Sequence, residues 1–336
     1  MLVFISSKQF VIITALIFTS IFACLVGFSN GSFKIEFSKI VFNNLSLLEK
    51  EVLLNIRAPR VALAVFVGAA LGVAGATLQG LFRNPLADPG LIGVSAGGAL
   101  GAVLSIVLLQ TFSNDNNMGI FLIPSSAIFG SLTVIGIIYI ITSGFNKSGI
   151  MYMLLVGIAL NAIATVGIGF LTFISSDSQL RNITFWMMGS YGSANWILLL
   201  PAIFVILAST IVLISISRKL DIMQLGEIEA YRVGVDIKKT KMIIIISTAI
   251  MIGASVSLSG IVGFIGLVVP HLVRLLGGAN HRYLLLGSAL MGVIISVNAD
   301  LFSRIVIQPA EIPIGLATSA LGAPFFLWLV LRLRER

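Results

Sequence analysis

The residues of this chain that could perform chemistry are few: two histidines and one cysteine. His271 and His281 lie beside Arg274 and Arg282 with no carboxylate or thiol close by in the sequence, which favours polar anchors at a helix end over a metal site. Cys24 stands alone, which excludes an internal disulfide and a cysteine-based metal site. The sequence contains no G-x-x-x-x-G-K-[S/T] loop, H-E-x-x-H helix or Ser/His/Asp set, so we expect no enzymatic activity.

The charged segment 220–241 is a candidate binding surface. Two glycine breaks frame a short stretch of helical composition between them. A solvated loop needs neither the paired glycines nor the apolar side chains beside them, so we expect two short amphipathic helices that bind a cytoplasmic partner. The residues concerned are Leu225, Gly226, Glu227, Ala230, Val233, Gly234 and Val235.

The elements that position these residues must lie in a membrane. Of the 336 residues, 58% are hydrophobic and only 10% are charged, whereas soluble domains carry about 25% charged residues. The mean hydropathy is +1.09. A net charge of +8 would suit nucleic acid, but the basic residues lie in loops between apolar spans, where they set membrane topology. We therefore predict a multi-pass protein of the cell membrane that binds no nucleic acid.

A membrane-spanning helix needs about 20 mostly apolar residues, and ten segments meet this requirement, with nine as the alternative count. The seventh and eighth form one apolar block that we divide at Ser257–Gly260. No linker or internal repeat interrupts the chain, so residues 1–336 are predicted to form a single all-α domain. The spans are Gln9–Asn30, Arg57–Phe82, Pro89–Gln110, Met118–Thr142, Ile150–Ile174, Trp196–Ser217, Thr240–Ser259, Val262–Gly277, Tyr283–Ser303 and Ile312–Arg332.

Ten spans place both termini on one side of the membrane. The uncharged run from Gln9 to Phe33 is too long for a signal-peptide core, so we predict a retained first helix. Most of the 21 Lys and Arg residues fall on the side of the termini, which makes that side cytoplasmic. Segments 31–55 and 175–195 then lie outside the cell, and segment 220–241 lies inside it.

Glycines recur every four residues at Gly68 and Gly72, and again at Gly93, Gly97 and Gly101. Small residues at this spacing let helix backbones approach closely in lipid, so the pattern predicts tight helix packing around a path. No Asp, Glu, Lys or Arg lies near the middle of any span, which argues against an ion-coupled carrier.

Further motifs carry a resemblance to a known family. Asp300 precedes Arg304 by four residues, which also predicts an ion pair on one helix face. The motifs are Arg57-x-Pro59-Arg60, Gln79-x-x-x-Arg83-Asn84-Pro85-Leu86-Ala87-Asp88-Pro89, Gly93-Val94-Ser95-x-Gly97, Gly260-x-x-Gly263-Phe264-x-Gly266-Leu267-x-x-Pro270-His271-x-x-Arg274, Asp300-x-x-x-Arg304 and Glu311-x-Pro313-x-Gly315-x-x-Thr318-x-x-x-Gly322-x-Pro324-x-Phe326. In this order they resemble the FecCD-type permease family, the membrane subunits of ATP-driven importers for ferric siderophores, haem and cobalamin.

The resemblance implies a type II importer permease with ten helices per subunit and two subunits, identical or homologous, around one path. It also implies two copies of a cytoplasmic ATPase, which bind ATP and Mg²⁺, and an extracytoplasmic substrate-binding protein. This chain itself would bind no cofactor. The expected cargo is a ferric siderophore, with haem or cobalamin as alternatives within the family and an ion-coupled secondary transporter as the alternative outside it.

The resemblance also implies roles for particular residues. Arg57, Arg60 and Arg304 would pair with carboxylates of the binding protein, and residues 225–235 would contact the ATPase. Relatives place small polar gate residues where this chain has Ile150 and Met151, which makes these two the candidate gate. The residues expected to pack helices or line the path are Gly68, Gly72, Gln79, Asn84, Pro85, Gly93, Gly97 and Gly101.

Overall fold

The computed structural model describes residues 6–31, 33, 35–36, 39, 42, 44–109, 116–143 and 150–334, and in these residues it contains helices and no strand. The N-terminal half comprises α1 (Ser7–Ser29), α3 (Leu47–Glu51), η1 (Val52–Arg57), α4 (Ala58–Phe82), η2 (Pro89–Ile92), α5 (Val94–Leu104), η3 (Ser105–Leu109), α6 (Asn116–Ser143) and α7 (Ile150–Ile174). The C-terminal half comprises α8 (Asp177–Met188), α9 (Trp196–Ser215), α10 (Ser217–Met223), α11 (Glu227–Arg232), α12 (Ile237–Ser259), α13 (Ile265–Gly277), α14 (His281–Ile305) and α15 (Ile314–Arg334).

Each of the ten predicted spans contains one main helix. Among the described residues, seven helices are long and apolar enough to cross a membrane, and three shorter apolar helices, Val94–Leu108, Ile265–Gly277 and Ile314–Trp328, occupy the other predicted spans. The predicted break between the seventh and eighth spans is present, because α12 ends at Ser259 and Gly260 has φ 67°. A side chain at Gly260 would collide with the Trp186 carbonyl, so this turn requires glycine. The all-α, multi-span architecture is confirmed.

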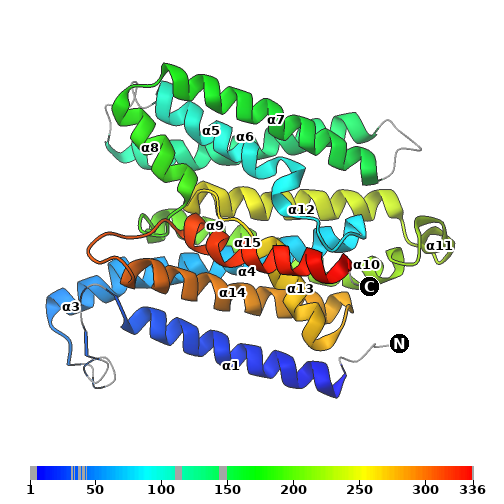
Figure 1. Cartoon of the computed structure of the whole chain (residues 1–336), viewed down its shortest axis with the longest axis horizontal. Helices are drawn as coiled ribbons and strands as arrows, with labels where there is room; N and C mark the ends of the chain where they lie inside the picture. Colours follow the sequence, from blue (N-terminus) through cyan, green and yellow to red (C-terminus); the bar gives the residue numbers. More distant parts are fainter. Residues whose placement is uncertain are drawn as a thin grey trace.

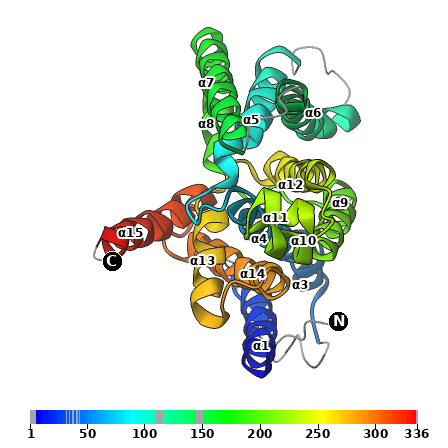
Figure 2. The ribbon, with the colours of Figure 1, turned by 90° about the vertical axis from the view of Figure 1, so that its right-hand side faces the viewer.

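Helix α4 lies at the centre of the bundle. It packs against α14, α12, α13 and α9, and Figure 2 shows these helices around it in a view along the bundle. In the most apolar stretch of the span that contains α4, 78% of the residues are buried, whereas 22% are buried in the corresponding stretch of α1. Its sequence is apolar on all faces, which is the pattern of a helix enclosed by others.

The two ends of the bundle carry different elements (Figure 1). The inner end, as we name it, holds the start of α1 at Ser7, the end of α15 at Arg334, and α10 and α11. The outer end holds α3, α8 and the start of α4. Helix α8 is the structure of the predicted outer segment 175–195, whereas much of segment 31–55 lies outside the described residues.

Candidate functional site

The α4–α14 crossing brings two backbones into direct contact. A Cβ at Gly68 would meet the Gly292 carbonyl oxygen, and a Cβ at Gly292 would meet that of Gly68. One turn further along, Gly72 faces the Ser288 carbonyl oxygen in the same way. Only glycine permits this approach on α4, and the close fit joins the two helices along much of their length.

The same packing recurs between α5 and α6. A Cβ at Gly97 would lie 2.7 Å from the Gly130 carbonyl oxygen, and one at Gly101 would meet that of Ser126. Gly93 has φ 81° and precedes the first residue of α5, so it has a turn role that the four-residue spacing did not indicate. A role of these glycines in a translocation path stays a prediction.

Gln79 connects the inner part of α4 to α13. Its Nε2 donates to the Leu267 carbonyl oxygen at 3.2 Å, and its Oε1 accepts from Arg274 Nη2 at 3.2 Å. These contacts give Gln79 a structural role between two helices. A contact between Gln79 and a translocated solute stays a prediction.

The turn after α4 is held by its own side chains. Asn84 Oδ1 accepts from the Leu86 N–H at 2.9 Å, and Pro85 is exposed. Asp88 Oδ1 accepts from the Gly90 N–H at 2.7 Å, and burial raises the pKa of Asp88. Asn84 and Asp88 therefore stabilise a compact connection to α5, and a role of Asn84 or Pro85 in lining a path stays a prediction.

The inner-end segment, residues 217–235, forms the two short helices that the glycine breaks predict. Gly226 has φ 124° and Gly234 has φ 89°, and they bracket α11. Ala230 and Val235 are buried, so they fix the segment to the bundle and cannot contact an outside partner directly. The exposed apolar side chains are Leu225 at 75%, Ile228 at 71%, Tyr231 at 74% and Val233 at 69%. Ile228 and Tyr231 were not among the seven predicted contact residues.

Two polar contacts join this segment to the helices beneath it. Asp221 Oδ1 accepts from the His281 backbone N–H at 2.9 Å and lies 2.6 Å from His281 Nδ1. Gln224 Nε2 donates to the Gly80 carbonyl oxygen at 2.7 Å. Helix α10 therefore holds the start of α14 and the end of α4 at once. His281 is therefore a polar anchor at a helix end, as predicted, and its partner Asp221 lies 60 residues away in the sequence.

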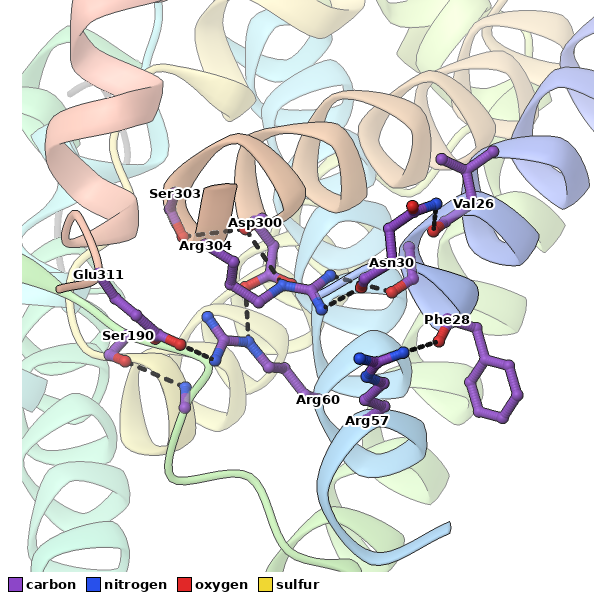
Figure 3. Close-up of polar contacts among 12 residues, drawn as sticks. Val26, Phe28, Asn30, Arg57, Arg60, Ser190, Asp300, Ser303, Arg304 and Glu311 are labelled. Carbon is purple, nitrogen blue, oxygen red and sulfur yellow. Dashed lines mark hydrogen bonds and ion pairs between the residues drawn. The ribbon is translucent and has the colours of Figure 1, made fainter. Parts of the chain in front are cut away.

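At the outer end, Asp300 lies between two guanidinium groups (Figure 3). Its carboxylate is 2.9 Å from Arg60 Nε and 3.1 Å from Arg304 Nε, and its side chain is 1% exposed. The predicted ion pair between Asp300 and Arg304 is present, and Arg60 is a second partner that sequence spacing did not reveal. Arg60 Nη1 also donates to Glu311 Oε1 at 2.9 Å.

Arg57 and Arg304 bind the outer end of α1 (Figure 3). Arg57 Nη1 donates to the Ser29 carbonyl oxygen at 2.7 Å, and Arg57 also donates to the Phe33 carbonyl oxygen. Arg304 Nη2 donates to the Gly27 carbonyl oxygen at 3.0 Å. We predicted outward-facing arginines, but all three arginines of this cluster are buried and bonded within the chain. Binding of a partner at these residues stays a prediction.

The gate prediction falls at the edge of the described structure. Ile150 and Met151 are the first two residues of α7, and their side chains lie outside what is described.

A cavity of about 510 Å³ opens beside α8 in the outer half of the bundle. Its walls come from α6, α8, α9 and α12 and combine Phe185 and Trp186 with Asn182, Asn195 and Ser257. No sequence motif predicted this cavity.

Comparisons with known proteins identify the family. Residues 15–332 match the FecCD transport family. The hemin transport system permease protein HmuU of Yersinia pestis is 47% identical over 283 residues, which are 84% of this chain and 84% of that protein. The vitamin B12 import system permease protein BtuC of Vibrio parahaemolyticus is 37% identical over 297 residues, 87% of this chain and 86% of that protein. A solved structure, described as an inward-facing conformation of a metal-chelate type ABC transporter, matches with a TM-score of 0.86 at 31% identity, over 96% of this chain and 99% of that one. The chain therefore belongs to the FecCD transport family of ABC-type permeases.

Proposed function

We propose that this chain is one of two membrane-spanning subunits of an ATP-driven importer for an iron chelate. Two copies of a separate ATPase bind ATP and Mg²⁺ at the inner end, and an extracytoplasmic binding protein delivers the cargo at the outer end. The cargo crosses by alternating access, and this chain breaks no bond itself. The multi-pass chain resides in the cell membrane.

The inner-end segment carries this proposal. It exposes apolar side chains at one end of the bundle while Asp221 and Gln224 fasten it to α14 and α4. The sequence has no phosphate-binding loop of its own. A motor that binds here and moves the segment therefore moves the two central helices with it.

The second permease subunit covers α7 and α15 in this proposal. Both helices stand away from the central group in Figure 2, and both expose large apolar side chains. Examples are Val166 and Phe170 on α7 and Leu321 on α15. Two copies that meet along these helices would enclose a path between them.

Hemin is the first cargo to test, because the relative with 47% identity is named as a hemin permease. A ferric siderophore, which the sequence motifs favoured, is the second, and cobalamin is the third. The three differ in size and charge but share the class of a large metal chelate.

Uptake into proteoliposomes tests the function. The vesicles contain this chain with its ATPase and are supplied with the binding protein of the same importer, loaded with hemin, a ferric siderophore or cobalamin. We expect uptake of an iron chelate that stops without ATP and continues when an ionophore removes the ion gradients. Uptake that survives without ATP and fails with the ionophore would instead identify an ion-coupled secondary transporter.

Charged residues on the exposed face of α11 should detach the ATPase. We expect the double variant Ile228→Asp with Tyr231→Asp to lose the ATPase during purification, because a carboxylate replaces each apolar contact. The variant Lys238→Asp is the control, since it changes net charge by the same amount at a nearby exposed position of α12. Co-purification of the ATPase with the double variant at the level of the control would contradict the assignment of this face.

A further inference from the structure

The three arginines at the outer end differ in their hydrogen-bond partners. Arg57 and Arg304 donate to backbone carbonyl oxygens at the end of α1 and beyond it, those of Gly27, Phe28, Ser29, Asn30 and Phe33. Releasing either guanidinium group would leave carbonyl oxygens at the end of α1 without these donors. Arg304 also pairs with Asp300, whereas the described partners of Arg60 are side chains alone, Asp300 and Glu311.

These two partners of Arg60 differ in exposure. The Asp300 side chain is 1% exposed, whereas that of Glu311 is 43% exposed. Within the described residues, the Glu311 carboxylate makes a single hydrogen bond, the one from Arg60 Nη1 at 2.9 Å. The Glu311 carboxylate is partly solvated, so water can replace Arg60 as its partner at small cost when Glu311 is displaced, while Asp300 stays in place.

There is room for a second carboxylate beside Glu311. A cavity of about 150 Å³ is lined by Arg60 and Glu311 together with Ser190, Tyr191 and Ser303. Arg60 Nη2 makes no hydrogen bond to the described residues, so it remains available as a donor. Guanidinium groups bind carboxylates through two parallel N–H groups, and Nη1 and Nη2 offer such a pair once Glu311 leaves.

Glu311 belongs to a segment that is connected to moving parts of the proposed importer. Its neighbour Ile312 donates from its N–H to the Ser303 carbonyl oxygen at 3.1 Å, which ties the segment to α14. The Ile314 N–H, at the first residue of α15, donates to the Gly189 carbonyl oxygen at 3.0 Å. Displacement of Glu311 therefore acts on the start of α15 and on the segment that follows α8.

We propose that Glu311 is an internal placeholder that occupies Arg60 until a carboxylate of the binding protein replaces it. This inference rests on the proposed function, because it presumes that a binding protein meets the outer end. The exchange replaces one carboxylate by another at Arg60 and leaves Asp300 bound. Docking then releases residues 306–313 and signals arrival of cargo to α15. Arg57 and Arg304 keep their bonds to the end of α1 during the exchange.

A binding measurement on the ATPase complex in lipid nanodiscs tests this assignment. The probe is the binding protein that supports uptake in the transport assay, and its Kd is measured against wild type, Glu311→Gln and Glu51→Gln. Glu51 is an exposed outer-end carboxylate that bonds Asn55 and not Arg60, so its variant makes the same change in net charge. We expect Glu311→Gln to bind about fivefold more tightly than wild type, the scale of one partly exposed ion pair, and Glu51→Gln to bind as wild type does.

The outcomes separate this inference from the proposed function. Failure of the wild type to bind the probe contradicts the function itself. Normal wild-type binding with an unchanged or weaker Glu311→Gln variant overturns the placeholder role, as does equal tightening by Glu51→Gln. A second measurement does not depend on the substitution: nitroxide labels at Ala310 and Ser193 should move apart when the binding protein is added to a complex that keeps Glu311. An unchanged distance there also overturns the exchange.

Discussion

Replacing Gly68 by valine is expected to prevent α4 and α14 from packing and to abolish the folded protein. A Cβ at this position would meet the Gly292 carbonyl oxygen and lie 2.6 Å from Ser296 Cβ. The obstacle is backbone, so no side-chain rotamer relieves it and the helices must separate. Overpacking costs about 1–3 kcal/mol where side chains can adjust, and we expect at least the upper end of that range here.

The thermal stability of the purified chain in detergent, followed by size-exclusion chromatography, measures this effect. Gly136→Val is the matched control, because Gly136 also lies in a spanning helix and a Cβ there meets none of the described atoms within 4 Å. The control should elute as wild type does at every temperature. A Gly68→Val protein as stable as Gly136→Val would show that the two backbones are not in contact in the native state.

Replacing Asp300 by asparagine is expected to destabilise the outer end by about 3–5 kcal/mol, the cost of removing one member of a buried ion pair. The substitution leaves the Arg60 and Arg304 guanidinium groups close together without the carboxylate between them. Because Arg304 also bonds the Gly27 carbonyl oxygen, the end of α1 should loosen first. Hydrogen exchange of the α1 backbone amides measures this local loosening.

An exposed ion pair provides the comparison. Glu229→Gln removes the partner of Arg232, whose pair is more than half exposed on both sides, and should change stability by less than about 1 kcal/mol. A double variant, Asp300→Asn with Arg60→Met, should lose less than the sum of the two single losses, because the second change removes one of the stranded charges. Additive losses would mean that Arg60 and Asp300 do not interact.

The sequence predicted the spans well because lipid imposes a length and a composition on them. The ends of helices could also be predicted from the sequence where glycine or proline determines the backbone conformation, as at Gly260, Gly226 and Gly234. The regular glycine spacing on α4 indicated close packing, although it could not say that Gly292 and Ser288 would be the facing residues. That choice depends on how helices far apart in sequence cross.

The polar contacts were less predictable for the same reason. Arg60 and Asp300 are 240 residues apart, and only the local pair between Asp300 and Arg304 follows from helical spacing. The family resemblance implied outward-facing arginines, but carbonyl groups at the end of α1 and two carboxylates bond them internally. The prediction that α11 has an exposed apolar face was correct in outline. That Ala230 points inward could be found only once the helix was placed against its neighbours.

The contacts at the two ends of the α4–α14 pair have a mechanical consequence. Helix α10 holds both helices through Gln224 and Asp221, and Asp300 joins them again at Arg60. Because α4 and α14 are connected at both ends and their backbones are in contact in between, the two helices resist sliding past each other. A movement applied at one face of the bilayer therefore reaches the opposite face as a tilt of the helix pair, and any shear falls on its boundaries with neighbours such as α12, α13 and α15.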